Sequence, residues 1–477
     1  MNRKFFTLFA LLLALALVLT ACPAQQPAAP AQEEAAPAAE EAAPAAEEAA
    51  PAQEEAAPAE MSGTGQPHLD KALAGEYAGT VVTMFGPFTG PDEVKFNESV
   101  AEFEKKTGID IQYTGSKEFE TTISVRVDAG DPPDIADFPQ PGLLGNLAKA
   151  GKVVDVSSFM NMEWLQKNYK QAWLDMATME GGDGSPIMAG VWARFNGKSQ
   201  VWYPKKAWDE AGYPIPQTWD EMMALTQQIA DDGDTAWCIG IESGTATGWP
   251  ATDWMEEIML RTTSLENYDK WTRGELPFTS PEVKRAAEIM AEIWLNPDYV
   301  FGGREGIVST FFGDAPAPMF EDPPKCWMHK QGNFITSFFP EGLEAGVDYD
   351  FFYLPPIDEE YGKPYLVAGD IYAMFNDRPE VRAVMEFFTT GESLRTWLAS
   401  GGALSPHNDA SLDWYGDDVE RKVAQFVQEA DSVRFDGSDL MPSEVGAGSF
   451  WKGMTDWIAG TVDLDTALAE IDAAWPR

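Results

Sequence analysis

The sequence is poor in the side chains that usually carry metal and nucleophile chemistry. Its 477 residues include three cysteines and three histidines, and His68, His329 and His407 stand far apart. No His-rich or Cys-rich metal pattern occurs, and the chain has no G-x-S-x-G elbow, P-loop or dinucleotide fingerprint. We therefore expect no metal, no cofactor and no catalysis. Carboxylate pairs for glycoside hydrolysis can be drawn from any acidic chain, so a secreted glycoside-acting enzyme stays open as the minor alternative.

Basic residues are also scarce. Lys and Arg total 33 against 77 Asp and Glu, which gives a formal net charge of −44. The first 21 residues carry +2 and residues 22–60 carry −9, which leaves −37 for the remainder. Such a surface repels nucleic acid, anionic lipid and most anionic substrates, so we expect none of these as partners. We interpret the acidity as a solubility adaptation.

Long apolar runs are absent except at the N-terminus. Arg3 and Lys4 precede a largely apolar run, residues 5–19, which is short for a membrane span and typical of a signal peptide. The sequence Leu-Thr-Ala-Cys that ends at Cys22 resembles a lipobox, which predicts a signal peptide at residues 1–21 and a lipid on Cys22. The mature protein would then be anchored to the outer side of the membrane. An ordinary secretory signal with an incidental cysteine is the alternative.

A low-complexity segment separates the signal from the folded part. Between residues 23 and 60, proline recurs every seven residues and pairs of glutamate recur with it. Leu, Ile and Val are absent there, so the spacing of seven does not indicate a coiled coil. We interpret residues 22–75 as an extended Ala/Pro/Glu-rich tether, with a partner-binding tail as the alternative.

The first folded segment predicts a βαβ unit. A β-branched run at residues 80–85 and an apolar run at residues 109–113 have the character of strands. Between them, Phe96 and Phe103 lie on one face of a helical pattern that ends at Gly108. Two strands joined by a helix are expected to be parallel, with a right-handed crossover. Their carboxyl ends, and the loops that follow, then meet at one edge of a sheet.

The next strand is short and ends abruptly. In the stretch AGDPPDIADFPQPG, residues 129–142, glycine and two prolines stop a helix, and Ile135 and Ala136 form a brief apolar strand. Polar and aromatic side chains follow at once. An open α/β sheet builds its ligand cleft at the carboxyl edge in this manner, although a purely structural corner has the same pattern.

A second set of elements begins after residue 189. Thr218 is expected to cap a helix and Glu221 to complete a capping box, so we interpret Trp219, which lies between them, as a packing residue. Residues 236–241 have the character of a buried strand that again ends on polar and aromatic groups. The run 366–371 predicts a strand that returns to the first set.

These segments together resemble a known family. The relevant motifs are Gly-x-x-Pro-Asp-Ile at residues 130–135, Thr-Trp-x-Glu at residues 218–221 and Gly-x-x-Ser-Pro at residues 402–406. With the segments around them, they resemble extracellular solute-binding protein family 1, the sugar-binding components of ABC importers, across nearly all of residues 78–477. Within that family the resemblance is closest to the alpha-glucoside-binding proteins.

The resemblance implies the fold. The expected class is α/β, a two-lobed periplasmic-binding-protein fold of type II, in which each lobe is a mostly parallel sheet flanked by helices. About three chain crossings would form the hinge. The expected domains are lobe one at residues 76–189 and 370–430, and lobe two at residues 190–369 and 431–477.

The resemblance also implies a binding cleft between the lobes. A neutral sugar has C–H faces and paired hydroxyls, so its receptor needs aromatic platforms together with carboxylate and amide acceptors. The candidate residues are Phe88, Thr89, Asp137, Phe138, Gln140, Glu242, Ser243, Thr245, Trp249, Trp254, Trp327, Asp370 and Trp451. For each acidic member the alternative is an ordinary capped or solvated side chain.

The implied function is transport. The chain would be the extracytoplasmic substrate-binding lipoprotein of an ABC sugar importer, and lobe closure would deliver α-glucosides, such as maltose, sucrose or trehalose-like sugars, to the permease subunits. Binding of another neutral or cationic solute is the alternative. We expect a monomer whose only contact with the membrane is the lipid.

The two remaining cysteines, Cys238 and Cys326, both lie on predicted strands of lobe two. The compartment outside the cytoplasm is oxidising and permits one disulfide without demanding it. We predict that these cysteines are bonded, with two buried free thiols as the alternative.

Overall fold

The structure is a computed structural model that describes residues 64–476. The predicted signal peptide, the lipidation residue Cys22 and the tether up to residue 63 lie outside the described residues. The described part belongs to one compact unit. None of its helices combines the length and the apolar character needed to cross a membrane.

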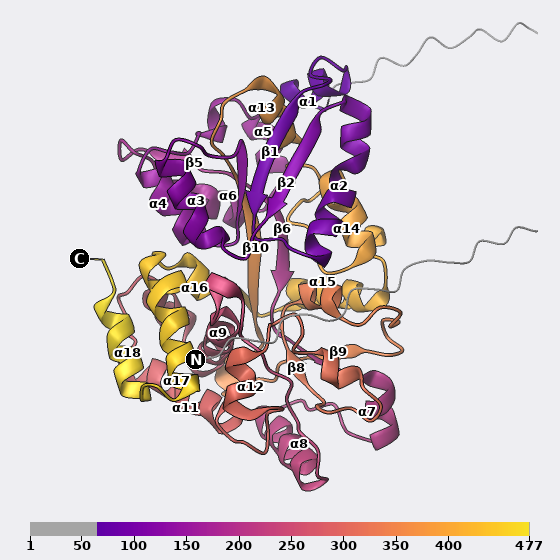
Figure 1. The fold of residues 1–477 in the computed structure, drawn as a ribbon, viewed down its shortest axis with the longest axis vertical. Helices are drawn as coiled ribbons and strands as arrows, with labels where there is room; N and C mark the ends of the chain where they lie inside the picture. Colours follow the sequence, from indigo (N-terminus) through magenta and orange to yellow (C-terminus); the bar gives the residue numbers. More distant parts are fainter. Residues whose placement is uncertain (1–63, 477) are drawn as a thin grey trace, which may run out of the picture. The chain divides into compact units, whose positions relative to one another are not determined.

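Three parallel strands form one side of the main sheet, as predicted (Figure 1). β1 (Val81–Gly86) pairs in parallel with β2 (Asp110–Gly115) on one side and with β3 (Ile135–Phe138) on the other. All four residues of β3 are buried, because both faces of the strand are covered. Its sequence therefore does not alternate between apolar and polar residues. The carboxyl ends of the three strands therefore lie at the same edge of the sheet.

Helices connect these strands in the predicted order. α2 (Pro91–Thr107) joins β1 to β2 and ends at Gly108, which adopts a left-handed φ of 72°. α3 (Phe119–Asp128) joins β2 to β3. A Cβ atom on Gly115 would lie 1.8 Å from the carbonyl oxygen of Phe88. Glycine at that position therefore lets the loop after β1 lie against the end of β2.

Two long strands, β10 (Pro364–Met374) and β6 (Val191–Gly197), and the short strand β11 (Ser432–Phe435) complete the six-stranded sheet. β10, all of whose residues are buried, pairs antiparallel with β6 along one edge. Its other edge pairs antiparallel with β3 and parallel with β11. The strand order is β11-β10-β3-β1-β2, with β6 on β10 outside this path. The return strand predicted at residues 366–371 is confirmed as part of β10.

A smaller sheet lies on the other side of these long strands. β7 (Gln200–Tyr203) is its central strand and pairs antiparallel with β8 (His329–Lys330) and β9 (Asp350–Tyr353). In Figure 1 it lies below the main sheet, among the helices α7, α8 and α12.

The regular strand predicted at residues 236–241 is wrong. This segment is extended and buried, but it forms only isolated parallel bridges, from Trp237 to Val300 and to Met328. Its backbone groups bond to irregular neighbouring segments, as in the bond from the Cys238 N–H to the Met328 carbonyl at 2.8 Å. The sequence has the burial pattern of a strand. A continuous β-ladder also needs a regular partner strand along its whole length, and this segment has none among the described residues.

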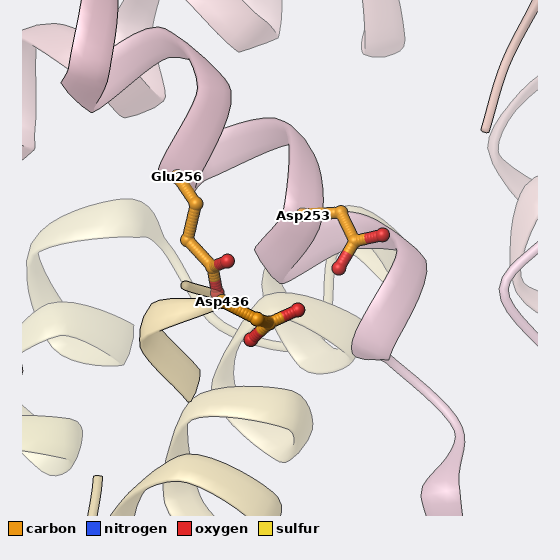
Figure 2. Close-up of side chains that lie close together, drawn as sticks. All are labelled: Asp253, Glu256 and Asp436. Carbon is orange, nitrogen blue, oxygen red and sulfur yellow. The ribbon is translucent and has the colours of Figure 1, made fainter. Parts of the chain in front are cut away.

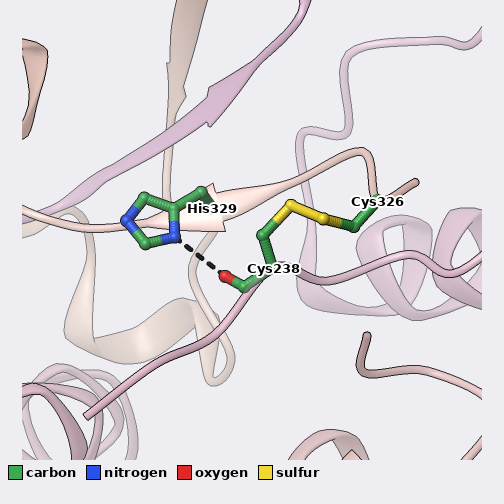
Figure 3. Close-up of a disulfide and its surroundings, with 3 residues drawn as sticks. All are labelled: Cys238, Cys326 and His329. Carbon is green, nitrogen blue, oxygen red and sulfur yellow. Dashed lines mark hydrogen bonds between the residues drawn. A yellow bond between two sulfur atoms is a disulfide. The ribbon is translucent and has the colours of Figure 1, made fainter. Parts of the chain in front are cut away.

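A disulfide joins Cys238 to Cys326, with 5.4 Å between the two Cα atoms (Figure 3). The bond ties two segments that are 88 residues apart in the sequence. Next to it, His329 Nδ1 lies 2.8 Å from the Cys238 carbonyl oxygen. The disulfide thus fixes the irregular segment 236–241 against the end of β8.

Two clusters of buried hydrophobic side chains form the core of the described part, and the first extends from the main sheet to the smaller one through Trp202 and Phe351. The elements that pack in the first, besides those of the main sheet, are α1 (Pro67–Leu73), α4 (Pro141–Lys149), α5 (Met162–Asn168), α6 (Gln171–Ala177), β4 (Thr178–Glu180), β5 (Pro186–Met188), α13 (Pro379–Phe387), α14 (Arg395–Ser400) and α15 (Asp418–Glu429). Those in the second are α7 (Lys205–Ala211), α8 (Trp219–Asp231), α9 (Trp249–Thr262), α10 (Leu265–Thr272), α11 (Pro281–Trp294), α12 (Gly303–Ser309), α17 (Trp451–Ala459) and α18 (Leu464–Ala473).

The capping box predicted at the start of α8 is confirmed. The Thr218 hydroxyl oxygen accepts the Glu221 N–H, and the Glu221 carboxylate accepts the N–H of Gln217 at 2.7 Å. Trp219 is buried in the second core, in agreement with its interpretation as a packing residue.

Candidate functional site

A cavity of about 160 Å³ opens at the carboxyl edge of the parallel strands. Its lining residues from the loops and helices that follow β1, β2 and β3 are Pro87, Phe88, Thr89, Asp92, Ser116, Lys117, Glu120, Pro139 and Gln140. Those from the rest of the chain are Arg194, Asn196, Lys198, Ser243, Ala246, Trp249, Phe311, Phe312, Phe334, Phe338, Ala368, Gly369, Asp370, Asp436, Asp439 and Trp451. Side chains from both cores therefore surround one space.

Three polar side chains line the cavity from the crossing strand β6 and from the residue that follows it. Arg194, Asn196 and Lys198 are spaced by two residues, and alternate side chains of a strand lie on the same face. On the neighbouring strand β10, Asp370 is in register with Arg194 and the small Ala368 is in register with Asn196. The crossing strands thus supply the polar floor of the cavity.

Two carboxylates and two aromatic rings contact the Arg194 guanidinium. Its Nε lies 2.6 Å from Asp370 Oδ2 and its Nη2 lies 3.6 Å from Asp92 Oδ2. The guanidinium carbon lies 4.3 Å from the ring centroids of both Phe88 and Trp397. Burial alone would lower the pKa of Arg194, but the two carboxylates raise it, so this side chain stays charged.

Lys198 is held in the same way. Its Nζ lies 2.8 Å from Asp253 Oδ1 and 2.6 Å from Asp436 Oδ2. Burial would lower the pKa of Lys198, and these two carboxylates more than reverse the effect. Each cation of the floor is thus paired with two carboxylates of the protein, which disfavours an anionic ligand.

Aromatic rings form one wall of the cavity. Trp249, the first residue of α9, lies edge-to-face with Phe312, 5.0 Å between ring centroids, and 5.8 Å from Phe334. Phe311 and Phe338 pack against Phe312 at 4.5 and 5.3 Å. Such a wall suits the C–H faces of a sugar ring.

Four buried polar atoms in the cavity lining have no hydrogen-bond partner within residues 64–476. They are Oδ1 of Asp92, Oε1 of Gln140, Nη1 of Arg194 and Oδ1 of Asn196. A buried polar atom without a partner costs about 1–3 kcal/mol. Three of these atoms accept hydrogen bonds and one donates, and all four belong to side chains that line the cavity.

Glu120 adds an acidic group to this lining. Burial raises the pKa of Glu120 to about 7. At neutral pH its carboxyl group is then partly protonated and can either donate to or accept from a ligand hydroxyl.

The structure brings seven of the thirteen predicted residues to the cavity. They are Phe88, Thr89, Gln140, Ser243, Trp249, Asp370 and Trp451. The loops after β1 and β3 and the start of α9 line the cavity, as predicted from the carboxyl ends of the strands.

Three predicted aromatic platforms lie in the hydrophobic cores instead. Phe138 packs against Phe119, Trp254 against Trp237 and Trp294, and Trp327 against Tyr213. Phe138 belongs to a strand buried on both faces, and α9 is buried around Trp254, so neither ring can turn toward the cavity.

Three predicted polar residues also lie outside the cavity lining. Asp137 is fully buried and accepts the Tyr113 hydroxyl at 3.2 Å, and burial raises its pKa well above the ordinary value. Glu242 accepts the N–H two residues further on, at 2.8 Å, and so stabilises its own turn. Thr245 is exposed and lines a separate shallow groove.

Sequence reasoning missed the residues of β6 and those near Asp436. The signal for β6 was present, because Arg194, Asn196 and Lys198 alternate with apolar and small residues in a strand that is otherwise buried. Polar residues at every second position of a buried strand indicate a polar cavity on one face. Asp436 had no comparable local signal.

Two contacts of Lys117 link the two sides of the cavity. Lys117, which follows β2, places its Nζ 3.7 Å from the ring centroid of Phe311. The Lys117 carbonyl oxygen also accepts the Thr245 hydroxyl at 3.1 Å. Both contacts join the segment after β2 to segments that follow residue 240.

Comparison with known proteins finds one family and close relatives. The model of the bacterial extracellular solute-binding proteins matches residues 90–400. Osmoprotective compounds-binding protein GgtB of Synechocystis sp. is 44% identical over 396 residues, which cover 83% of this chain and 92% of that protein. Alpha-glucosides-binding periplasmic protein AglE of Rhizobium meliloti is 42% identical over 401 residues, 83% and 87% of the two chains.

Solved structures show the same fold at low sequence identity. The bacterial solute receptor AcbH aligns with a TM-score of 0.71 at 18% identity, covering 83% of this chain and 97% of its own. Maltose-bound MalE3 of T. maritima aligns with a TM-score of 0.63 at 14% identity, covering 83% and 98%. The predicted α/β two-lobed fold of type II is confirmed, whereas the expectation of a mostly parallel sheet in each lobe is wrong for the smaller sheet, in which β7 pairs antiparallel with both of its neighbours.

Proposed function

Because the chain belongs to the bacterial extracellular solute-binding proteins, we propose that it is the substrate-binding lipoprotein of an ABC sugar importer and binds α-glucosides. Membership of the family already makes the chain an extracytoplasmic solute-binding protein of the sugar-binding kind. Beyond the family, we propose the identity of the ligand, the lipid anchor and the residues that bind.

The observation that carries the proposal is the pairing of aromatic rings with unpartnered polar atoms in one cavity. Trp249 and its neighbouring rings offer a platform, while Asp92, Gln140, Arg194 and Asn196 offer hydrogen bonds that the protein leaves unmade. The internally neutralised cations disfavour an anionic ligand. A neutral polyhydroxylated ring meets all three requirements.

The choice of α-glucosides rests on likeness to the alpha-glucosides-binding protein of Rhizobium meliloti. A second candidate class is osmoprotective solutes, because the osmoprotective compounds-binding protein of Synechocystis is about equally similar. The two classes overlap where a glucosyl group is attached to a small polyol.

Calorimetric titration of the mature protein tests the proposal. The panel holds maltose, sucrose, trehalose and glucosylglycerol as α-glucosides, with cellobiose as the β-linked control and glycine betaine as a zwitterionic osmoprotectant. We expect saturable 1:1 binding of at least one α-glucoside and no binding of cellobiose. Binding of glycine betaine alone would contradict the sugar assignment, and release of glucose from any α-glucoside would contradict a pure binding role.

Delivery requires that the lobes close on the ligand. We propose that residues 76–189 with 370–430, and residues 190–369 with 431–477, move as two lobes about the crossing strands β6 and β10. A ligand that touches both lobes binds the closed form more tightly and shifts the equilibrium by that difference alone. The lipid proposed on Cys22 would keep the protein beside the permease, because diacylation anchors a chain stably.

A further inference from the structure

A cluster of buried charges lies directly behind the cavity floor. Its carboxylates are Asp253, Glu256, Glu257, Asp436 and Asp439, and its cations are Lys198, Arg261 and Lys330. With every group in its ordinary ionised form, five negative charges face three positive ones. Buried charge without a counter-charge is strongly unfavourable, so this cluster requires further positive charge.

The three cations are already committed to particular carboxylates. Lys198 bonds to Asp253 and Asp436, and Arg261 forms an ion pair with Glu257. Lys330 lies 3.8 Å from Glu257. Within residues 64–476, Glu256 forms no ion pair at all, although it is fully buried.

Two carboxylate oxygens of the cluster also lack any hydrogen-bond partner in the described part of the chain. They are Oδ2 of Asp253 and Oε2 of Glu256, and both side chains are at most 1% exposed. The other oxygens are occupied: Asp253 Oδ1 accepts Lys198, and Glu256 Oε1 accepts the Ser438 N–H at 3.0 Å. The unpartnered oxygens of Asp253 and Glu256 are thus available to a ligand. Asp436 has no unpartnered oxygen, because its Oδ1 accepts the Ser438 hydroxyl and the Asp439 N–H and its Oδ2 accepts Lys198, so it would bind a ligand through a remaining lone pair.

The geometry brings three carboxylates to one point. Asp253 and Glu256 lie three residues apart on α9, and therefore on one face of that helix. Asp436, which precedes α16 (Gly437–Leu440), approaches from another segment of the chain (Figure 2). One oxygen from each of the three lies within 4.8 Å of the others. An ion at about 2.4 Å from each oxygen could therefore contact all three.

We propose that Asp253, Glu256 and Asp436 form a binding site for a hard divalent cation, with Ca²⁺ as the ion that fits best. The donors are all oxygens, which Ca²⁺ prefers over the nitrogen and sulfur ligands of transition metals. A charge of +2 would balance the two excess negative charges of the cluster. Water would complete the coordination shell.

The site would act on solute binding through Asp436. That residue holds Lys198 at 2.6 Å, and both line the solute cavity. A bound cation would fix Asp436 and therefore the position of the Lys198 ammonium group. We expect Ca²⁺ to increase the affinity for the solute severalfold, whichever solute the cavity accepts.

The rival explanation is protonation. Burial raises the pKa of both Glu256 and Asp439 well above the ordinary value, so two protons could supply the missing positive charge. The two explanations differ in a measurable way, because a proton site shows no selectivity among added metal ions.

The test uses the mature protein freed of metal with EDTA, and then CaCl₂, MgCl₂ and NaCl as probes. Calorimetry should show one Ca²⁺ per chain with a Kd of about 10⁻⁵ M or below. At 1 mM Ca²⁺ the melting temperature should rise by about 2–4 °C. Absence of both effects at millimolar Ca²⁺, at pH 6 and at pH 8, would leave protonation as the explanation and overturn the proposal.

Two variants separate the site from the acidic surface. Glu256→Gln keeps the bond to the Ser438 N–H and should weaken Ca²⁺ binding by at least about tenfold. Asp418→Asn removes the same charge from a side chain that is 96% exposed and should change nothing. Equal Ca²⁺ binding by the wild type and Glu256→Gln would show general attraction to the surface and would contradict the site. If Glu256→Gln does not fold, Tb³⁺ luminescence excited through tryptophan in the wild type decides, because Ca²⁺ must displace a single Tb³⁺.

Discussion

Single tryptophans illustrate how position decides role. Trp249 lines the cavity and is partly exposed, whereas Trp254, five residues later on the same helix, is buried between Trp237 and Trp294. We expect Trp249→Ala to lower solute affinity by about ten- to a hundredfold with little change in stability. Trp254→Ala should instead lower the free energy of unfolding by about 3–5 kcal/mol. Calorimetry and urea denaturation of both variants check this, and equal loss of affinity in a folded Trp254→Ala variant would contradict it.

A buried histidine predicts acid sensitivity. Burial lowers the pKa of His407 to about 4, whereas an unfolded chain has a His pKa of about 6.5. Between these values the unfolded state binds more protons, so stability falls as the pH drops from 6.5 toward 4, by up to about 3 kcal/mol. His407→Gln should reduce the loss without abolishing it, because burial also lowers the pKa of His329 to about 4; urea denaturation between pH 7.5 and 4.5 measures this. His68→Gln, at a partly exposed position, is the control and should change the slope less; an unchanged slope in His407→Gln would refute the prediction.

At the scale of elements, the disulfide holds segment 236–241 in place where regular strand pairing is missing. Segment 236–241 forms only isolated bridges, and the bond between Cys238 and Cys326 closes a loop across 88 residues. Replacing both cysteines with alanine should therefore lower the free energy of unfolding by about 2–4 kcal/mol. Denaturation of the variant measures this. Thiol titration of the denatured, unreduced wild type should find no free thiol from these two residues, and two reactive thiols would contradict the bond.

At the scale of the whole molecule, the contact between Lys117 and Phe311 is expected to favour closure of the lobes. A cation over a ring contributes about 0.5–1 kcal/mol at an exposed site, so Lys117→Ala should weaken solute binding by about two- to fivefold. Small-angle scattering of the unliganded variant should give a larger radius of gyration than the wild type. Lys149→Ala, which removes an equally charged and largely exposed side chain outside the cavity lining, is the matched control. Identical scattering and affinity in Lys117→Ala would rule out this role.

The sequence by itself determined the local elements of the first lobe. The alternation of strand and helix in residues 80–142 and the stop at Gly108 depend on neighbours within a few residues, as does the capping box of α8 in the second lobe, and all are present in the structure. The family motifs identified the fold. The sequence also located the loops that carry Phe88 and Gln140, because the carboxyl ends of parallel strands meet at one edge.

Only the tertiary structure decided which side chains enter the cavity. Phe138, Trp254 and Trp327 look like platforms in the sequence, but long-range packing turns them into the cores. The polar floor depends on the pairing of β6 with β10, and the bond between Lys198 and Asp436 joins residues 238 positions apart. No pattern within a short window can specify such contacts, because the orientation of a side chain relative to a cavity is set by elements distant in the chain.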